Sequence, residues 1–294
     1  MTDSSKQDNF EMVVMNTRDI NHSTQSLRYA IDRQEFEVVY QPKFVMQTEQ
    51  IVGCEALLRW TQEDGCVISP DIFIPQAEES GMITSITLYV VEQVFRCLRE
   101  WNTKRIKIVP VSINVSRIDL CAPAFIEQFI ELFEEYQIDS QDIELEITET
   151  AMGKECNKIA DKISILRSRG IRIAIDDFGT GYSSLLCLKT LPIDIIKIDR
   201  MFLKDIVTDA VDQSILKCIL VLAEIFHLEV VYEGVETVEQ ISYLKQFGFM
   251  KAQGFYFARA MHEQELEIWL IDKTDFFSNA VTAARQDGYP SLLN

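Results

Sequence analysis

Short runs of β-branched and aromatic residues alternate with longer stretches of helical periodicity from about residue 23 onward. Helical spacing is clearest at Ile126, Phe129, Phe133 and Tyr136, which recur at intervals of three and four, and the long segment 205–226 is also helical in pattern. Strands are predicted over 36–41, 51–60, 111–116, 142–148, 171–176, 194–199, 228–233 and 250–255. Eight strands with helices between most of them, over about 250 residues, predict an α/β fold, a TIM-like (β/α)8 barrel.

The start of this barrel is expected to be irregular. Only about ten residues separate the first two predicted strands, which is too few for a crossover helix. These strands should therefore pair antiparallel as a hairpin, giving a modified barrel with a partly antiparallel start. A doubly wound open sheet is the alternative, but no G-x-G-x-x-G motif follows the early strands.

The chain is expected to contain one folded domain, over 23–273, between two terminal segments. Residues 1–22 are polar and lack sustained periodicity, so they are interpreted as a tail or linker, and 274–294 as a C-terminal extension. The start shows no signal-peptide pattern, and the longest apolar tract, 215–226, is interrupted by Lys217 and Glu224. No membrane contact is therefore expected from this chain.

The cysteines and the net charge argue against several kinds of site and partner. The seven cysteines are scattered without a C-x-x-C pair, which argues against a zinc site or a disulfide framework and favours a reducing cytoplasm. The net charge of −18 repels phosphates, so binding to DNA or RNA polymers is not expected. An anionic substrate would need bound metal ions or a few well-placed Arg and Lys side chains.

Acidic and amide side chains occur in or just after apolar strands, where a carboxylate costs several kcal/mol unless it is paired or bound to metal. The set is Glu55, Asn114, Glu146, Asp176, Asp177 and Glu233. In a barrel, the carboxyl ends of the strands share the face that carries the active site. Surface salt bridges or helix caps would account for any one of these residues, but not for all six together.

The composition of this set predicts a two-metal site. Oxygen ligands with no His or Cys nearby favour Mg²⁺ or Mn²⁺, and five carboxylates require two divalent ions for near neutrality. Such an ion pair suits in-line displacement at phosphorus. Lys197 is placed to orient or activate the attacking water, and Arg59 to receive a phosphate oxygen. The glycine-containing loop 177–185 beside these residues could gate the substrate or contact a partner.

Motifs along residues 25–270 resemble those of the EAL-domain cyclic di-GMP phosphodiesterases. In chain order they are YQP at 40–42, EALLRW at 55–60, NVS at 114–116, EITE at 146–149, DDFGTGYSSL at 176–185, KID at 197–199, EGVET at 233–237 and QG at 253–254. The resemblance implies a metal-dependent phosphodiesterase that hydrolyses cyclic di-GMP to linear pGpG by two-metal in-line water attack. It also implies a homodimer, and Ca²⁺ is expected to inhibit because its longer bonds misplace the water.

The resemblance also assigns roles to residues. One metal would be held by Glu55, Asn114, Glu146 and Asp176, and the other by Asp176, Asp177 and Glu233. Lys197 would act on the water, with Glu55 and Gln253 as further catalytic groups. Gln41, Arg59 and Asp199 would contact substrate, although Asp199 could equally hold the strand end in place. Glu149 would support the loop 177–185.

Two positions depart from the family pattern, and two other functions compete with catalysis. Tyr232 replaces a small residue before Glu233, and Ala260 replaces a proline. Neither removes a ligand, and strand alternation should point Tyr232 away from the side of Glu233. The alternative functions are a catalytically silent cyclic di-GMP receptor and a protein-interaction module. Members with such roles typically lose ligands, whereas here the set is complete.

Overall fold

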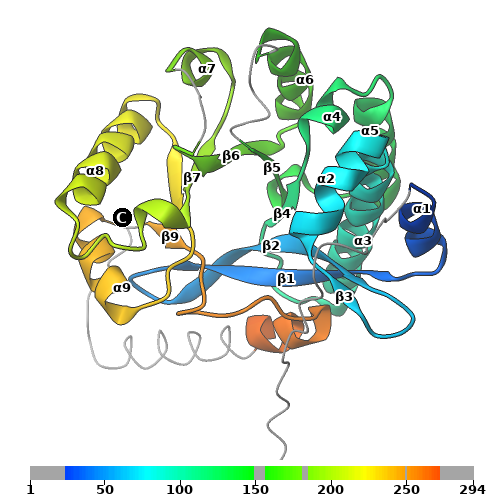
Figure 1. Ribbon diagram of the computed structural model, residues 1–294, viewed down its shortest axis with the longest axis horizontal. Helices are drawn as coiled ribbons and strands as arrows, with labels where there is room; N and C mark the ends of the chain where they lie inside the picture. Colours follow the sequence, from blue (N-terminus) through cyan, green and yellow to red (C-terminus); the bar gives the residue numbers. More distant parts are fainter. Residues whose placement is uncertain (1–23, 149–155, 181–184, 249, 272–294) are drawn as a thin grey trace, which may run out of the picture.

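The structure is a computed structural model that describes residues 24–148, 156–180, 185–248 and 250–271. Eight strands form a closed ring in the spatial order β1-β9-β8-β7-β6-β5-β4-β2, closed by pairing of β2 with β1. Their bounds are β1 (Phe36–Val45), β2 (Gln50–Thr61), β4 (Val111–Asn114), β5 (Ile143–Thr148), β6 (Arg172–Phe178), β7 (Ile195–Ile198), β8 (Glu229–Tyr232) and β9 (Lys251–Ala252). The predicted TIM-like barrel is confirmed (Figure 1).

The irregular start of the barrel is confirmed as well. Strand β1 runs antiparallel to both of its neighbours, β2 and β9, whereas the other pairs in the ring are parallel. In the β1–β2 hairpin, Gln41 lies opposite Glu55. The two-residue strand β3 (Val67–Ile68), which was not predicted, extends β2 outside the ring.

Helices surround the barrel (Figure 1). The labelled helices are α1 (Thr24–Asp32), α2 (Pro70–Ser80), α3 (Ile83–Lys104), α4 (Arg117–Cys121), α5 (Phe125–Tyr136), α6 (Cys156–Ser168), α7 (Leu185–Thr190), α8 (Ala210–Ile225) and α9 (Val238–Leu244). Residues 263–271 are helical as well. Short 3-10 turns η1 (Ser140–Asp142), η3 (Arg200–Phe202) and η4 (Lys245–Phe247) lie between them. Helix α8 begins later than its pattern predicts, because the Asp209 carboxylate caps it by accepting from the backbone N–H groups of Val211 and Asp212.

The two faces of the barrel strands differ in polarity. In β5, Ile143, Leu145 and Ile147 are buried in the main core between strands and helices. The residues between them, Glu144 and Glu146, are also buried and point to the opposite face, the barrel interior. The strands therefore use their outer face for packing and leave much of the inner face for polar groups.

Three further expectations concern the terminal segments, the cysteines and membrane contact. The predicted terminal segments, 1–22 and 274–294, lie outside the described residues. Five of the seven cysteines are free thiols in the structure: Cys54, Cys66, Cys97, Cys121 and Cys218. No helix in the described part of the chain has both the length and the apolar character required to cross a membrane.

Candidate functional site

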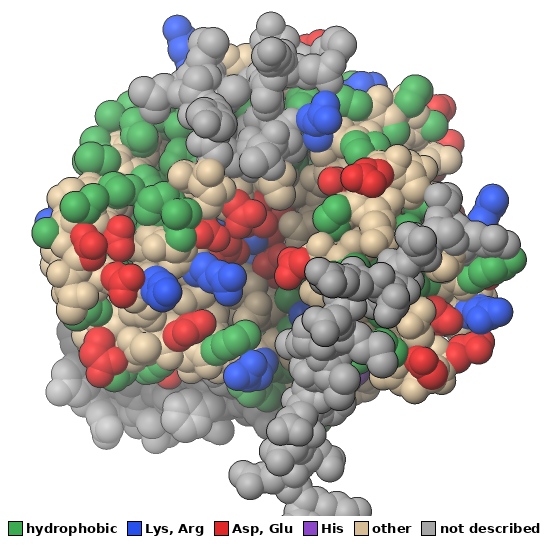
Figure 2. Space-filling view, in the orientation of Figure 1, with side chains coloured by type: hydrophobic (Ala, Val, Ile, Leu, Met, Phe, Trp, Pro, Cys, Tyr) green, Lys and Arg blue, Asp and Glu red, His purple; other side chains and the backbone are tan. Residues whose placement is uncertain are grey.

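The carboxyl ends of the strands surround an acidic cavity of about 310 Å³. Seven of the predicted site residues line it: Gln41, Glu55, Asp176, Asp177, Asp199, Glu233 and Gln253. Acidic side chains gather around a hollow near the centre of the face shown in Figure 2. The residues come from strands far apart in the sequence, and closure of the barrel brings them together.

Lys197 is fully buried and contacts carboxylates that line this cavity. Its ammonium group lies 2.8 Å from Glu233 Oε1, 3.0 Å from Asp176 Oδ1 and 3.3 Å from Glu55 Oε2. It also donates a short hydrogen bond to Glu146 Oε2. One lysine thus contacts four carboxylates from four strands or strand ends.

Amide side chains fix the orientation of Glu55. Asn114 Nδ2 donates to Glu55 Oε1 at 2.8 Å, and Gln253 Nε2 donates to Glu55 Oε2 at 2.8 Å. Gln253 Nε2 also donates to Gln41 Oε1 at 2.9 Å, and Gln41 Nε2 donates to the carbonyl oxygen of Ala258 at 3.1 Å. Both oxygens of Glu55 are therefore held in place before any ligand enters.

The buried carboxylates and the lysine at this cavity shift one another's pKa values. Burial, followed by the charge of Glu146, raises the pKa of Glu55, and burial also raises the pKa of Glu233 well above its usual value. Burial alone would lower the pKa of Lys197, but Asp176, Glu146 and Glu233 outweigh burial and raise it. A site that holds carboxylates at such an electrostatic cost is suited to divalent cations.

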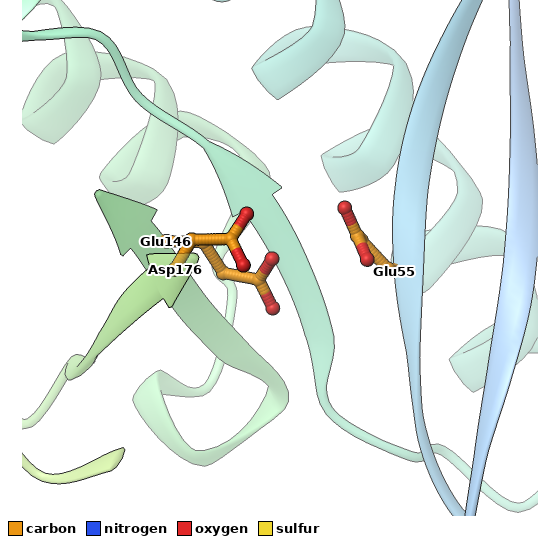
Figure 3. Close-up of side chains that lie close together, drawn as sticks. All are labelled: Glu55, Glu146 and Asp176. Atoms are coloured by element: carbon orange, nitrogen blue, oxygen red, sulfur yellow. The ribbon is translucent and has the colours of Figure 1, made fainter. Parts of the chain in front are cut away.

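Two groups of carboxylates have the spacing of metal ligands. Glu55, Glu146 and Asp176 each offer an oxygen, and these oxygens lie within 4.8 Å of one another. The same holds for Asp176, Asp177 and Glu233. Figure 3 shows the first group, with Glu55 facing Glu146 and Asp176 across a common space. Asp176 belongs to both groups, so it is placed to bridge two ions.

Asp177 has an unusual backbone conformation for a non-glycine residue, with φ at 53°. Its carbonyl oxygen accepts from the backbone N–H of Thr180 at 3.2 Å and from Thr180 Oγ1 at 2.8 Å, so it starts a tight turn. Burial and the charges of Asp176 and Asp199 raise the pKa of the Asp177 carboxyl to about 6. This acid therefore changes charge close to neutral pH.

Two substrate candidates, Arg59 and Asp199, differ in position. Arg59 and Asn114 line an adjoining, mostly apolar cavity of about 250 Å³ whose walls include Leu57, Ile74 and Val115. Asp199 lines the acidic cavity and also accepts from the backbone N–H of Met201 at 2.8 Å, which caps η3. Both of the roles considered for Asp199 are thus compatible with its position. Glu149 and the loop residues 181–184 lie outside the described residues.

Lys43 is a buried residue that contacts the site residue Glu146 and was not predicted from the sequence. It lies in β1, two residues after Gln41, and its ammonium group lies 2.7 Å from Glu146 Oε1. The signal was present, since Lys43 is a charged side chain within an apolar strand. Its partners Glu144 and Glu146, however, lie 101 and 103 positions away in the sequence. Arg200, Glu236 and Phe255 also line the acidic cavity and were not predicted.

Tyr232 points away from the cavity, as strand alternation predicts. Its ring is buried in the main core between the barrel and the helices, whereas its neighbour Val231 faces a small apolar cluster with Ala174 and Ile195. The tyrosine therefore does not crowd the carboxylate of Glu233.

Comparison with known proteins identifies the family of this chain. The EAL domain model matches residues 24–260. The chain is 35% identical to a cyclic di-GMP phosphodiesterase of Pseudomonas aeruginosa, PA2567, covering 83% of this chain and 42% of that protein. It is 34% identical to the oxygen sensor protein DosP of Escherichia coli, covering 83% of this chain and 31% of that protein. The chain thus spans less than half the length of these two relatives.

Solved structures give the same result. The fold is similar to that of the PaMucR phosphodiesterase in complex with c-di-GMP, with a TM-score of 0.78 and 33% identity, covering 82% of this chain and 98% of that chain. It is also similar to the EAL enzyme Bd1971 in its cAMP- and cyclic-di-GMP-bound form, with a TM-score of 0.79 and 31% identity, covering 84% and 67%. Family match, sequence identity and barrel topology agree, and the chain belongs to the EAL domain family.

Proposed function

We propose that this chain hydrolyses cyclic di-GMP to linear pGpG with the help of two divalent ions, Mg²⁺ or Mn²⁺. The observation that carries the proposal is the pair of carboxylate groups that share Asp176. Shared carboxylates are typical of two-metal sites, whose ions lie about 3.5–4 Å apart. The names of two similar proteins, a cyclic di-GMP phosphodiesterase and a phosphodiesterase in complex with c-di-GMP, support the choice of substrate.

The residues fit such ions, because the donor set consists of oxygens and is over-charged without them. Glu55, Asn114, Glu146 and Asp176 would hold one ion, and Asp176, Asp177 and Glu233 the other. Bound there, the ions would supply positive charge to the attacking water and to the phosphate oxygens. The Glu55 carboxylate needs no rearrangement for this role, since Asn114 and Gln253 already orient it.

Lys197 would position the attacking water. Once cations occupy the carboxylate oxygens, its ammonium group no longer needs to neutralise four acids and can donate a hydrogen bond to the water. In the reaction, the water oxygen forms a new bond to phosphorus and the bond from phosphorus to the ribose 3′ oxygen breaks. The water loses one proton, and the leaving 3′ oxygen gains one.

The substrate would span the two cavities. Gln41 lines the acidic cavity, where the reacting phosphate would bind, and Arg59 lies at the adjoining apolar cavity. A cavity of about 250 Å³ with Leu57 and Ile74 in its walls suits a planar guanine base, and Arg59 beside it would contact a phosphate oxygen.

We also propose that the enzyme acts as a homodimer in the cytoplasm. The first part rests on the family resemblance, and the second on the scattered free thiols. Light scattering of the purified chain would measure its mass in solution, and a monomeric mass at working concentration would contradict the dimer.

The direct test is incubation of the purified chain with cyclic di-GMP and Mg²⁺ or Mn²⁺, followed by separation of the products. Linear pGpG should form, and EDTA should abolish its formation. The matched control is Glu55→Gln, which keeps the shape of the side chain but weakens a ligand. If the wild type binds the nucleotide without converting it, the silent-receptor function replaces the proposed one.

A further inference from the structure

Two lysines are fully or almost fully buried in the described part of the chain, and they divide the oxygens of one carboxylate between them. Lys197 donates to Glu146 Oε2, while Lys43 donates to Glu146 Oε1 at 2.7 Å. Neither lysine lines the acidic cavity itself, but Lys197 contacts three carboxylates that do, those of Glu55, Asp176 and Glu233. The ion pairs of Lys43 are instead with Glu144 and Glu146. Lys43 is therefore not placed to position the attacking water, and its contact with Glu146 must serve another role.

Lys43 is fixed in position by contacts with two further residues, Ser112 and Glu144. Its ammonium group also donates to Ser112 Oγ at 2.5 Å and lies 3.5 Å from Glu144 Oε2. With Glu146 Oε1, these contacts use all three of its N–H donors. Ser112 Oγ donates to Glu144 Oε2 at 3.0 Å, and Arg172 Nη1 donates to Glu144 Oε1 at 3.1 Å. Lys43 is thus the upper member of a buried network that reaches away from the cavity.

This arrangement leaves Glu146 one oxygen for a cation. Oε2 faces Lys197, which also contacts Glu55 and Asp176, the other members of the first carboxylate group. Oε1 faces Lys43 on the other side. A cation at Oε2 takes the place of Lys197 on that oxygen, as the proposed function already requires. Binding to both oxygens would also break the second buried ion pair, between Oε1 and Lys43.

If Glu146 can offer only one oxygen, binding of Ca²⁺ should be weakened more than binding of Mg²⁺. Ca²⁺ accepts six to eight oxygens at about 2.3–2.6 Å and often binds a carboxylate through both oxygens. Mg²⁺ requires near-octahedral geometry at about 2.0–2.1 Å, which single oxygens satisfy. Outer contacts of this kind typically change metal affinity by about 10–100-fold.

We propose that Lys43 is a positioning residue that keeps Glu146 bound to metal through a single oxygen and thereby disfavours Ca²⁺ at this site. The inference rests on the proposed metal site. It predicts a change in the affinity for Ca²⁺ relative to Mn²⁺. A loss of positive charge or of folding would alter both affinities and would not by itself change their ratio.

The test is calorimetric titration of the metal-free protein with Mn²⁺ and, separately, with Ca²⁺, in the wild type and in Lys43→Met. Methionine approximates the length of the lysine stem and removes the ammonium group. We expect the affinity for Ca²⁺ relative to Mn²⁺ to rise by about tenfold or more. In turnover assays with Mg²⁺, the same variant should be inhibited by correspondingly less Ca²⁺.

The control is Lys251→Met. Lys251 also lies in a barrel strand, β9, and its ion pair is with Glu229 rather than with Glu146. This variant removes the same charge from the barrel, and its ratio of Ca²⁺ to Mn²⁺ affinity should match that of the wild type.

A second variant guards against misfolding. In Lys43→Met/Glu144→Gln, the lost positive charge is balanced by a lost negative charge in the network below, while Glu146 is still released. It should show the same rise in the affinity ratio. The proposal is overturned if the two affinities change by the same factor, since electrostatics alone would then account for the effect. A wild type that binds neither ion would instead overturn the metal site and the proposed function.

Discussion

At the scale of single residues, Lys197 is the group whose removal separates catalysis from binding. Lys197→Ala should lower kcat by about 10²–10⁴-fold, because a group that positions the water is lost. Affinity for cyclic di-GMP, measured with Ca²⁺ in place of Mg²⁺, should change little, since Gln41 and Arg59 remain. A parallel loss of turnover and affinity would make Lys197 a binding residue instead.

The acid Asp177 should make metal binding depend on pH. Its pKa of about 6, raised by burial and by the charges of Asp176 and Asp199, means that it is mainly protonated below pH 6 and ionised above it. A protonated carboxyl cannot serve as a ligand, so affinity for Mn²⁺ should fall as the pH drops from 7.5 to 5.5. The measurement is calorimetric titration at both values. In Asp177→Asn the pH dependence should be weaker, and an unchanged dependence would assign the proton to another acid.

At the scale of elements, two strand ends pack so closely that one of them must carry glycine. A Cβ on Gly254 would lie 2.1 Å from the backbone oxygen of Val235, and the N–H of Val235 donates to the carbonyl oxygen of Gln253 at 3.1 Å. Gly254→Ala should therefore displace Gln253 and cost about 1–3 kcal/mol of folding stability together with turnover. Thermal melts and assays would measure both.

The matched control is Gly65→Ala. Gly65 also has a positive φ, but a Cβ there would meet nothing within 4 Å. In both variants alanine must adopt a positive φ, which lowers folding stability. Only in Gly254→Ala does the new Cβ also clash with the backbone of Val235. Equal loss of stability and turnover in the two variants would show that backbone strain, rather than contact with Val235, is responsible.

The elements were largely predictable because their patterns are local. The alternation in β5, with apolar Leu145 and Ile147 beside Glu144 and Glu146, specifies both a strand and its two faces. The first residue of α8 was less predictable. The helical periodicity continues upstream of Asp209, and only the cap formed by the Asp209 side chain sets where the helix begins. A strand was predicted over 250–255, but only Lys251–Ala252 form β9, because its length depends on pairing with β1 and β8 and not on a local pattern.

At the scale of the whole molecule, metal ions should stabilise the fold. An ion that binds only the folded state adds about 2.7 kcal/mol at a concentration of 100 times its Kd, which corresponds to about 5–10 °C in Tm for a chain of this size. Mg²⁺, Mn²⁺ and Ca²⁺ should all raise Tm in thermal melts, whereas only Mg²⁺ and Mn²⁺ should support turnover.

Two comparisons distinguish ligation from screening of the net charge of −18. NaCl at matched ionic strength should raise Tm much less than Mg²⁺ does. Asp176→Asn, which alters the acid common to both carboxylate groups, should lose most of the rise. An equal rise in this variant would mean that the ions act through the surface charge. Full turnover in Ca²⁺ alone would contradict the proposed site geometry.

The convergence of the site was predictable only in part. Barrel topology places the ends of parallel strands on one face, so the meeting of Glu146, Asp176 and Glu233 followed from the fold class. The network below them did not follow, because Lys43 comes from the antiparallel strand and its depth in the barrel depends on the register with β2. Side-chain direction at Arg59, which lines the apolar cavity rather than the acidic one, also depends on tertiary packing.

The seam between β1 and β9 has a consequence for the order of events during folding. The contact of Gln41 with Gln253 joins residues 212 positions apart, so the chain must close nearly its whole domain into a loop before this contact forms. Parallel pairs such as β5–β6 join nearer segments and can assemble earlier. A partly assembled sheet would hold Glu146 and Asp176 together but lack the support that Gln253 gives Glu55. We therefore expect ions at the proposed site to slow the unfolding of the barrel and to leave its folding rate largely unchanged, because the support that Gln253 gives Glu55 forms late.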